Sequence, residues 1–464
     1  MSPRKLAEEE ILNLLQINGQ HHIINHYRKL NKEKRKVFLT NLQELNLPLG
    51  FELYKKFSQQ EISPPRREIN PAPIITQEVL HNDQQRMIKA RALGEELLRS
   101  QKVAVLIVAG GQGTRLGFEG PKGIFPITPV KKKSLFQLFC ETIKALSLKY
   151  GIPIPLLIMT SQENHEQTVN YFKEHNFFGL RAENVHFFQQ GMLPTFTPEG
   201  GLLLKEETNL LANPDGHGGS LKALYESSLL DYLKNHGFTE LFYCQVDNPL
   251  VKIADPLFLG VHKMEEAEIS TKVVRRRDLK EKVGIYGLLN GQPAIIEYSD
   301  FLPADYEAVD EKGHMRYWAG NTAIHVISLA FIERLNQCGF ALPYHRAIKD
   351  VYGCGPEGKL MQRRAWKFET FVFDALPLAQ KCCALEVRRE EEFAPVKNKE
   401  GADSPATARA ALNSLYRHWL AEVGAEIAPE IQVEISPLFA LDKDDLSVRL
   451  KGKKLILKED TYLA

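Results

Sequence analysis

The chain has 464 residues, of which 44% are hydrophobic and 25% charged, values that are ordinary for folded globular proteins. They argue against a disordered, collagen-like or disulfide-stapled chain. A formal net charge of +1 gives no general attraction to nucleic acids or anionic membranes. The first thirty residues contain no apolar signal core, and no stretch approaches the roughly 18 apolar residues of a membrane span. The six cysteines form no C-x-x-C pair and are too sparse for a disulfide framework, so we expect reduced thiols and a cytoplasmic protein. From the balanced charge and the lack of a membrane span, we expect neither nucleic-acid nor membrane partners.

The first 100 residues are expected to form a helical N-terminal region. Apolar residues recur at helical spacing through residues 5–57. The proline-rich segment 63–73 cannot continue a helix and is predicted to form an extended strap. A further helix is predicted over residues 77–99.

Strand and helix patterns then alternate. A continuous apolar run at residues 103–108, VAVLIV, is typical of a parallel strand buried on both faces. Further short apolar runs predict strands at 155–160, 185–188 and 241–246, and helical patterns lie at 135–150, 163–175 and 220–236. This alternation predicts an α/β domain over residues 101–400. A helix at 407–423 and apolar runs at 431–435 and 446–457 predict a small C-terminal lobe, 401–464, containing β structure.

The loop after the first of these strands is rich in glycine. It reads A-G-G-Q-G-T-R-L-G from Ala109, and Pro121-Lys122-Gly123 follows. Glycines let a ligand approach the backbone, and successive N–H groups attract phosphate. Leu116 replaces the last glycine of a dinucleotide fingerprint, and Gly123 replaces the Ser or Thr of a Walker A loop. The loop therefore predicts phosphate binding with Arg115 and Lys122 as cations, while glycine content alone leaves a tight turn without ligand as the alternative.

The motif A-G-G-x-G-T-R-L followed by P-K-G resembles the activation loop of the sugar-nucleotide pyrophosphorylases. Further blocks, in the family order, resemble the UDP-N-acetylglucosamine pyrophosphorylase branch of the uridylyltransferases. They are FFQQGMLP (187–194), PDGHGG (214–219), VDNPLVKIADP (246–256), IEYS (296–299), AGN (319–321), FVFD (371–374) and EVRREEEFAPVKN (386–398). The resemblance implies a Rossmann-like, glycosyltransferase-A-like nucleotidyltransferase fold, in which helices flank a mixed α/β sheet.

The resemblance also implies roles for individual residues. Those expected to bind UTP are Ala109, Gly110, Gly111, Gln190 and Gly216 at the uridine, Arg115, Lys122 and Lys367 at the triphosphate, and Asp247 with the nucleotide and Mg²⁺. Those expected at the sugar are His217, Glu297, Tyr298 and Asn321, and Lys397 is expected at phosphate. Arg115, Lys122 and Lys397 are the expected catalytic residues, and Asp247 is the expected metal ligand, with Mn²⁺ as a substitute for Mg²⁺.

The implied reaction makes UDP-N-acetylglucosamine and pyrophosphate from UTP and N-acetylglucosamine 1-phosphate. These residue types suit it, because a phosphate monoester is already ionised at neutral pH and needs no Ser-His-Asp device to become a nucleophile. The reaction instead needs cations that neutralise two polyanions and hold them in line. Asp247 directly follows the apolar run 241–246, at the carboxyl end of a strand, where open α/β sheets bind ligands.

His217 departs from the family pattern, which has Asn in D-G-N-G-G. The G-H-G sequence is similar to that of UDP-glucose and broad-specificity UDP-sugar pyrophosphorylases, so a UDP-glucose or broad-specificity enzyme is the alternative. A protein that binds UDP-sugars without turnover is a further alternative, and it is disfavoured by the presence together of Arg115, Lys122, Asp247, Lys367 and Lys397. A nicotinamide oxidoreductase is disfavoured by Leu116.

Overall fold

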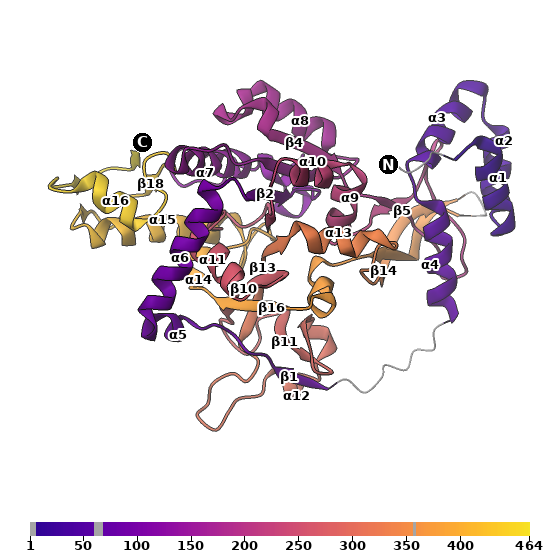
Figure 1. Cartoon of the computed structure of the whole chain (residues 1–464). Coiled ribbons are helices and arrows are strands. Elements are labelled where there is room, and N and C mark those ends of the chain that lie inside the picture. The colour runs from indigo at the N-terminus through magenta and orange to yellow at the C-terminus, as the bar shows by residue number, and fades with distance from the viewer. Residues whose placement is uncertain (1–5, 60–67, 356–358) are drawn as a thin grey trace. The chain divides into compact units, whose positions relative to one another are not determined.

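The computed structural model describes residues 6–59, 68–355 and 359–464 (Figure 1). It divides into two compact units. Unit 1 comprises the described residues of Met1–Arg66, Gln189–Leu229 and Leu335–Ala375, and unit 2 comprises those of Arg67–Phe188, Leu230–Arg334 and Leu376–Ala464. These boundaries differ from the consecutive regions 1–100, 101–400 and 401–464 that the sequence suggested, because strand pairing between distant segments decides which of them fold together.

Unit 1 contains the helical region predicted for the N-terminus. Its helices are α1 (Glu8–Ile17), α2 (His21–Lys29), α3 (Lys32–Gln43) and α4 (Leu47–Gln59). Their apolar faces share one core with later segments of the unit, including the fully buried Phe196 and Phe368. The ring of His22 donates from Nε2 to the Leu202 carbonyl at 2.8 Å, which ties α2 to one of those segments.

Two antiparallel groups of strands complete unit 1. The antiparallel partners β14 (His345–Cys354) and β15 (Leu360–Glu369) are joined by β6 (Leu204–Glu206) and β7 (Asn209–Leu210). A separate antiparallel pair is formed by β5 (Met192–Pro194) and β8 (Ala212–Pro214), and α9 (Gly219–Glu226) follows. The pairing of β5 with β8 brings the segments on either side of them, which carry Gln190 and Gly216, close to one another.

Unit 2 is built on a mixed sheet, as predicted. The fully buried β2 (Val103–Val108) lies between two parallel neighbours, β9 (Glu240–Gln245) and β3 (Leu156–Thr160), with β4 (Val185–Gln189) beyond β3. On the other side of β9 the pairing becomes antiparallel. The remaining strands are β13 (Ala319–Ser328), β10 (Ile269–Arg275), β11 (Ile285–Leu289), β12 (Gln292–Ile296), β1 (Ile69–Pro71) and β16 (Cys382–Glu386). The strap is extended where described, at β1, and residues 63–67 lie outside the described residues.

Helices flank this sheet. They are α5 (Gln77–Asn82), α6 (Gln84–Arg99), α7 (Leu135–Tyr150), α8 (His165–Glu174), α10 (Leu229–Asn235), α11 (Pro256–Met264), α12 (Pro303–Tyr306), α13 (Leu329–Gln337) and α14 (Arg389–Glu392). The helix predicted over 77–99 is interrupted at Asp83, whose carboxylate accepts from the Arg86 N–H at 2.9 Å and caps α6. Helix α11 crosses α6 closely, since a Cβ at Gly260 would lie 1.6 Å from the Ala90 carbonyl oxygen.

The C-terminal lobe contains β structure, as predicted. Its elements are α15 (Pro405–Glu422), β17 (Glu426–Ile427), β18 (Val433–Ile435), α16 (Lys443–Leu450), β19 (Ile456–Leu457) and β20 (Thr461–Leu463). The apolar run that starts at Leu446 begins as a helix instead of a strand, because Asp442 caps α16. The lobe packs beside α7 (Figure 1) and shares the core of the sheet through Leu412 and Trp419. Among the described residues, no helix is both long and apolar enough to cross a membrane.

Candidate functional site

The parallel strands β9, β2 and β3 of unit 2 end side by side. Val108, the last residue of β2, is in register with Gln245 of β9 and Met159 of β3. The residues that follow each strand therefore meet at one edge of the sheet. This is the edge at which open α/β sheets bind ligands.

The glycine-rich loop at this edge is closed by its own backbone. The N–H of Gly113 donates to the Gly120 carbonyl at 2.8 Å, and the N–H of Lys122 donates to the Gly111 carbonyl at 3.1 Å. Arg115 is exposed on the short 3-10 turn η1 (Thr114–Leu116). Lys122 opens a second 3-10 turn, η2 (Lys122–Ile124), and its Nζ lies 3.7 Å from Oδ2 of Asp247. The structure thus brings together Lys122 and Asp247, which are 125 positions apart.

Gly111 is a glycine that protein packing does not require. A Cβ at this position would contact no protein atom within 4 Å, and its φ does not lie in the left-handed region. A glycine without either requirement fits a place where a ligand approaches the backbone. Its neighbours Ala109 and Gly110, predicted with it to hold uridine, follow β2 directly.

A third segment joins the same edge. The N–H of Val396 donates to the carbonyl of Asp247 at 2.8 Å, and the next residue, Lys397, is exposed. The N–H of Lys397 donates to the Asp403 carbonyl at 2.7 Å, which folds the chain back on itself. Asp247, Lys122 and the backbone that leads to Lys397 therefore lie together, and their action on phosphate stays a prediction.

The predicted sugar residues of unit 2 lie around Gly284. The N–H of Asn321, on β13, donates to the Gly284 carbonyl at 2.8 Å, and a Cβ on Gly284 would lie 3.2 Å from Oε1 of Glu297. Tyr298 is 40% exposed, with Nζ of Lys282 5.6 Å from its ring centroid. Glu297 and Asn321 are therefore close together, and Tyr298 offers an accessible ring beside them.

Asn164 is a site residue that sequence reasoning missed. It is fully buried, its Nδ2 donates to the Ala109 carbonyl at 2.9 Å, and its Oδ1 accepts from the Ser161 N–H at 2.9 Å. It occupies the N-cap of α8, yet its side chain makes no capping bond and holds the glycine-rich loop instead. The available signal was its place in the short loop that follows a buried parallel strand, at the ligand-binding edge.

Asp247 is the carboxylate predicted to hold a metal ion. The described residues contain no group of three or more His, Cys, Asp or Glu side chains arranged to hold one. Asp247 is largely buried and offers hard oxygen donors. This suits Mg²⁺, which is commonly bound by one or two carboxylates together with substrate phosphates and water.

In unit 1, Asp215 shapes the loop that carries Gly216. The N–H of Asp215 donates to the Gly191 carbonyl at 3.0 Å, and its own carbonyl accepts from the Thr370 N–H at 2.8 Å. Gly216 has φ +88°, and a Cβ there would lie 2.3 Å from the Thr370 carbonyl oxygen, so only glycine fits. Gln190 is buried and directly precedes Gly191. Gln190 and Gly216 are therefore brought together, as their shared assignment to uridine predicts.

His217 is held against aromatic rings of unit 1. Its centroid lies 5.3 Å from that of Phe371 and 5.6 Å from that of Phe373, and its Nδ1 accepts from the Val372 N–H at 3.2 Å. Burial lowers the pKa of His217 to about 4, so the ring is neutral at pH 7 and carries its proton on Nε2. The predicted sugar contact remains a prediction. Lys367 lies half-buried on β15 of the same unit.

Asp215 predicts a pH dependence of stability. Burial raises its pKa to about 7, against the opposing effects of Lys222 and backbone N–H groups. Between about pH 4 and pH 7 the native state keeps a proton on Asp215 that the unfolded chain has released. The contribution of this proton to the free energy of unfolding is therefore complete below about pH 4 and is lost as the pH rises through 7. We expect the melting temperature of Asp215→Asn minus that of the parent to increase as the pH rises from 4 to 7.5, and to stay constant at higher pH. The exposed Asp350→Asn on β14 is the control, and a difference independent of pH would contradict this prediction.

Comparison with known proteins shows the family of this chain. The family model described as UTP–glucose-1-phosphate uridylyltransferase matches residues 51–442. The UDP-N-acetylglucosamine pyrophosphorylase of Saccharomyces cerevisiae is 36% identical over 457 residues, covering 94% of this chain and 95% of the yeast protein. The solved UDP-N-acetylglucosamine pyrophosphorylase of Trypanosoma brucei has a similar fold, with TM-score 0.83 and 24% identity over 100% of this chain and 99% of its own. A solved UDP-glucose phosphorylase of the same organism has a TM-score of 0.59 and 16% identity, covering 95% of this chain and 97% of its own. This chain belongs to the UTP–glucose-1-phosphate uridylyltransferase family.

Proposed function

We propose that this protein is a uridylyltransferase that makes UDP-N-acetylglucosamine and pyrophosphate from UTP and N-acetylglucosamine 1-phosphate. The observation that carries the proposal is the approach of Lys122 Nζ to Asp247 Oδ2, 3.7 Å apart, where β2 and β9 end. A lysine and a carboxylate at the ligand-binding edge suit a nucleotide triphosphate and its divalent ion. The yeast relative, similar over nearly its whole length, carries the name of this activity.

The chemistry follows from charge. An oxygen of the sugar phosphate, already ionised at neutral pH, attacks the α-phosphorus of UTP while the bond to pyrophosphate breaks. Arg115, Lys122 and Lys397 neutralise the phosphates, because two polyanions repel each other until cations lie between them. Bound at Asp247, Mg²⁺ or Mn²⁺ supplies further positive charge at the phosphate oxygens. Binding both substrates together supplies the positioning that an in-line displacement needs.

The sugar is proposed to lie at Glu297, Tyr298 and Asn321. Glu297 and Asn321 offer an acceptor and an amide, which pair with hydroxyl and N-acetyl groups, and the accessible Tyr298 ring offers a flat apolar face. A glucose-preferring or broad-specificity enzyme is the second candidate, favoured by His217. We place the enzyme in the cytoplasm, because all six of its cysteines are free thiols.

The proposed function is tested by pyrophosphate release from UTP with a panel of sugar 1-phosphates and Mg²⁺. We expect the highest kcat/KM with N-acetylglucosamine 1-phosphate and measurable use of glucose 1-phosphate or N-acetylgalactosamine 1-phosphate. Strong preference for glucose 1-phosphate would support the second candidate. Absence of pyrophosphate release with every sugar would refute the proposal.

Asp247→Asn tests the metal role. The amide keeps the shape of the side chain, and the bond from the Val396 N–H goes to the Asp247 carbonyl, so the fold should persist. The charge that holds a hard cation is lost, and we expect kcat to fall about 100-fold or more, with only partial recovery in excess Mg²⁺ or Mn²⁺. The exposed Asp231→Asn on α10 is the matched control. Parent-like activity of Asp247→Asn, or activity of the parent without any divalent ion, would contradict the role.

His217→Asn tests sugar choice. An Asn carbonyl oxygen can accept the Val372 N–H as Nδ1 does, while the amide offers two donors in place of the single donor of a neutral ring. We expect the ratio of kcat/KM for N-acetylglucosamine 1-phosphate to that for glucose 1-phosphate to rise, by up to about tenfold. His26→Asn, which removes a ring that bonds the Glu207 carbonyl in the same unit, should leave the ratio unchanged. An unchanged ratio in His217→Asn would show that this residue does not set sugar choice.

A further inference from the structure

Lys272 is a buried cation that none of the assigned roles includes. It lies on β10 with no exposed surface, and its Nζ is 2.7 Å from Oδ2 of Asp255 and 2.5 Å from Oε2 of Glu392. Lys252 joins the same cluster, 3.1 Å from Oε2 of Glu391 and 3.6 Å from Oε1 of Glu392. Burying such ions costs solvation energy, and apolar side chains of similar volume often stabilise a fold as well or better. The cluster therefore calls for a reason besides stability.

The carboxylate end of the cluster leads directly to the phosphate side of the site. The carbonyl of Glu392 accepts from Nδ2 of Asn248 at 2.7 Å, and Oδ1 of Asn248 accepts from the Ala394 N–H at 3.0 Å. Two residues on, the Val396 N–H donates to the carbonyl of Asp247. The segment 392–397 therefore runs beside Asp247 and Asn248. Its first residue, Glu392, forms the ion pair with Lys272.

The backbone of Lys272 leads to the sugar side. Its carbonyl accepts from Oγ1 of Thr322 at 2.7 Å, and Val273, the next residue, is in register with Asn321 of β13. The pairing of β10 with β13 shifts register between Thr271 and Val273, so Lys272 lies at an irregularity of the ladder. Such bulges re-aim neighbouring side chains, and here the neighbour is a proposed sugar ligand.

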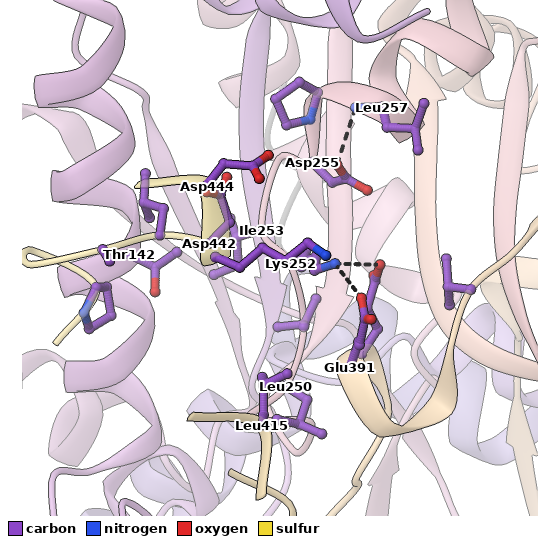
Figure 2. A pocket seen from close by; sticks show the side chains of 18 of the residues that line it. Thr142, Leu250, Lys252, Ile253, Asp255, Leu257, Glu391, Leu415, Asp442 and Asp444 are labelled. Carbon is purple, nitrogen blue, oxygen red and sulfur yellow. Dashed lines mark hydrogen bonds and ion pairs between the residues drawn. The ribbon is translucent and has the colours of Figure 1, made fainter. Parts of the chain in front are cut away.

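The cluster also borders a cavity of about 460 Å³ that contains none of the predicted site residues in its lining. Figure 2 shows Lys252 reaching toward Glu391, with Asp255 in the same wall. Glu391 and Glu392 line this cavity, so on this side the segment is held by its ion pairs with Lys252 and Lys272.

We propose that Lys272 is a positioning residue that, through Glu392 and Asn248, sets Asp247 and Lys397 in place for phosphate chemistry and, through Thr322, sets Asn321 at the sugar. It touches neither substrate. The inference rests on the proposed function for its kinetic consequences, while its structural consequence, the fixing of residues 392–397, is measurable in the protein alone.

The kinetic experiment compares Lys272→Met, Glu392→Gln and the double variant with the parent. We expect kcat to fall about 10- to 100-fold in the single variants, with KM for UTP within about threefold, because a displaced Asp247 or Lys397 acts mainly on the transition state. Thr322→Val, which keeps the side-chain shape, should instead raise KM for the sugar 1-phosphate about three- to tenfold and leave KM for UTP unchanged. A merely structural role would give no such division between kcat and KM.

Lys133→Met is the matched control. Lys133 is also buried and bonded to a carboxylate, Oε2 of Glu141 on α7, at 2.5 Å. We expect it to lower the melting temperature as Lys272→Met does, with kcat within about twofold of the parent. If Lys272→Met fails to fold, Asn248→Asp replaces it, because a carboxylate keeps the acceptor for the Ala394 N–H but repels the Glu392 carbonyl.

Hydrogen exchange gives a readout that needs no activity. The amides of Ala394 and Val396 should exchange faster in Lys272→Met than in the parent, and not in Lys133→Met. A folded Lys272→Met or Asn248→Asp with parent-like kcat, or with unchanged exchange at these amides, would overturn the proposal. A parent that makes no UDP-sugar would refute the proposed function, and the exchange result would then decide the positioning role by itself.

Discussion

The candidate site of unit 2 depends on one constraint, the parallel register of β9, β2 and β3. Six consecutive residues of β2 are buried, so this strand can be accommodated only at the centre of the sheet. With parallel neighbours on both sides, the three carboxyl ends coincide. The glycine-rich loop, Asn164 and Asp247 are therefore neighbours because of strand order, before any of their own contacts is made.

Two side chains that bond to backbone groups refine this placement. The side-chain amide of Asn164 donates to the Ala109 carbonyl, although Asn164 occupies the N-cap position of α8. Asn248, next to Asp247, donates from Nδ2 to the Glu392 carbonyl and accepts at Oδ1 from the Ala394 N–H, in the segment that leads to Lys397. Each fixes a backbone group at or beside a residue predicted to belong to the site. Catalysis by fixed charges requires such support, because electrostatic stabilisation depends on donors and cations that are held in place before the reaction begins.

Two ion pairs of unit 2 differ in how deeply they are buried. Lys122 and Asp247 are partly exposed and 3.7 Å apart, a separation that leaves both able to meet a ligand. Lys272 and Glu392 are buried and in direct contact, so each satisfies the other. Burial raises the pKa of Asp255, but the charges of Lys272 and Lys252 outweigh this effect and hold the pKa below its ordinary value, so the Asp255 carboxyl stays ionised. The first arrangement suits binding and the second suits support.

The sequence by itself determined the elements whose signals are local. The run 103–108 became β2 with those bounds, and 135–150 became α7, because Ser134 caps its start and the left-handed Gly151 ends it. The glycine-rich loop, its two cations and the strand-end Asp247 were likewise predictable, since each follows from residue type and position after a strand. The family motifs extended this to residues, such as Asn321 and Lys397, whose surroundings give no local signal.

Only the tertiary structure decided what depends on contacts between distant residues. The interruption of the helix 77–99 at Asp83 and the helical start of α16 reflect side-chain caps that compete with apolar periodicity. The make-up of unit 1, in which three separate stretches share a core, follows from long-range strand pairing that no local pattern encodes. Asn164 and Lys272 are ordinary in sequence, and their roles come from the backbone groups and carboxylates that folding brings within hydrogen-bonding distance.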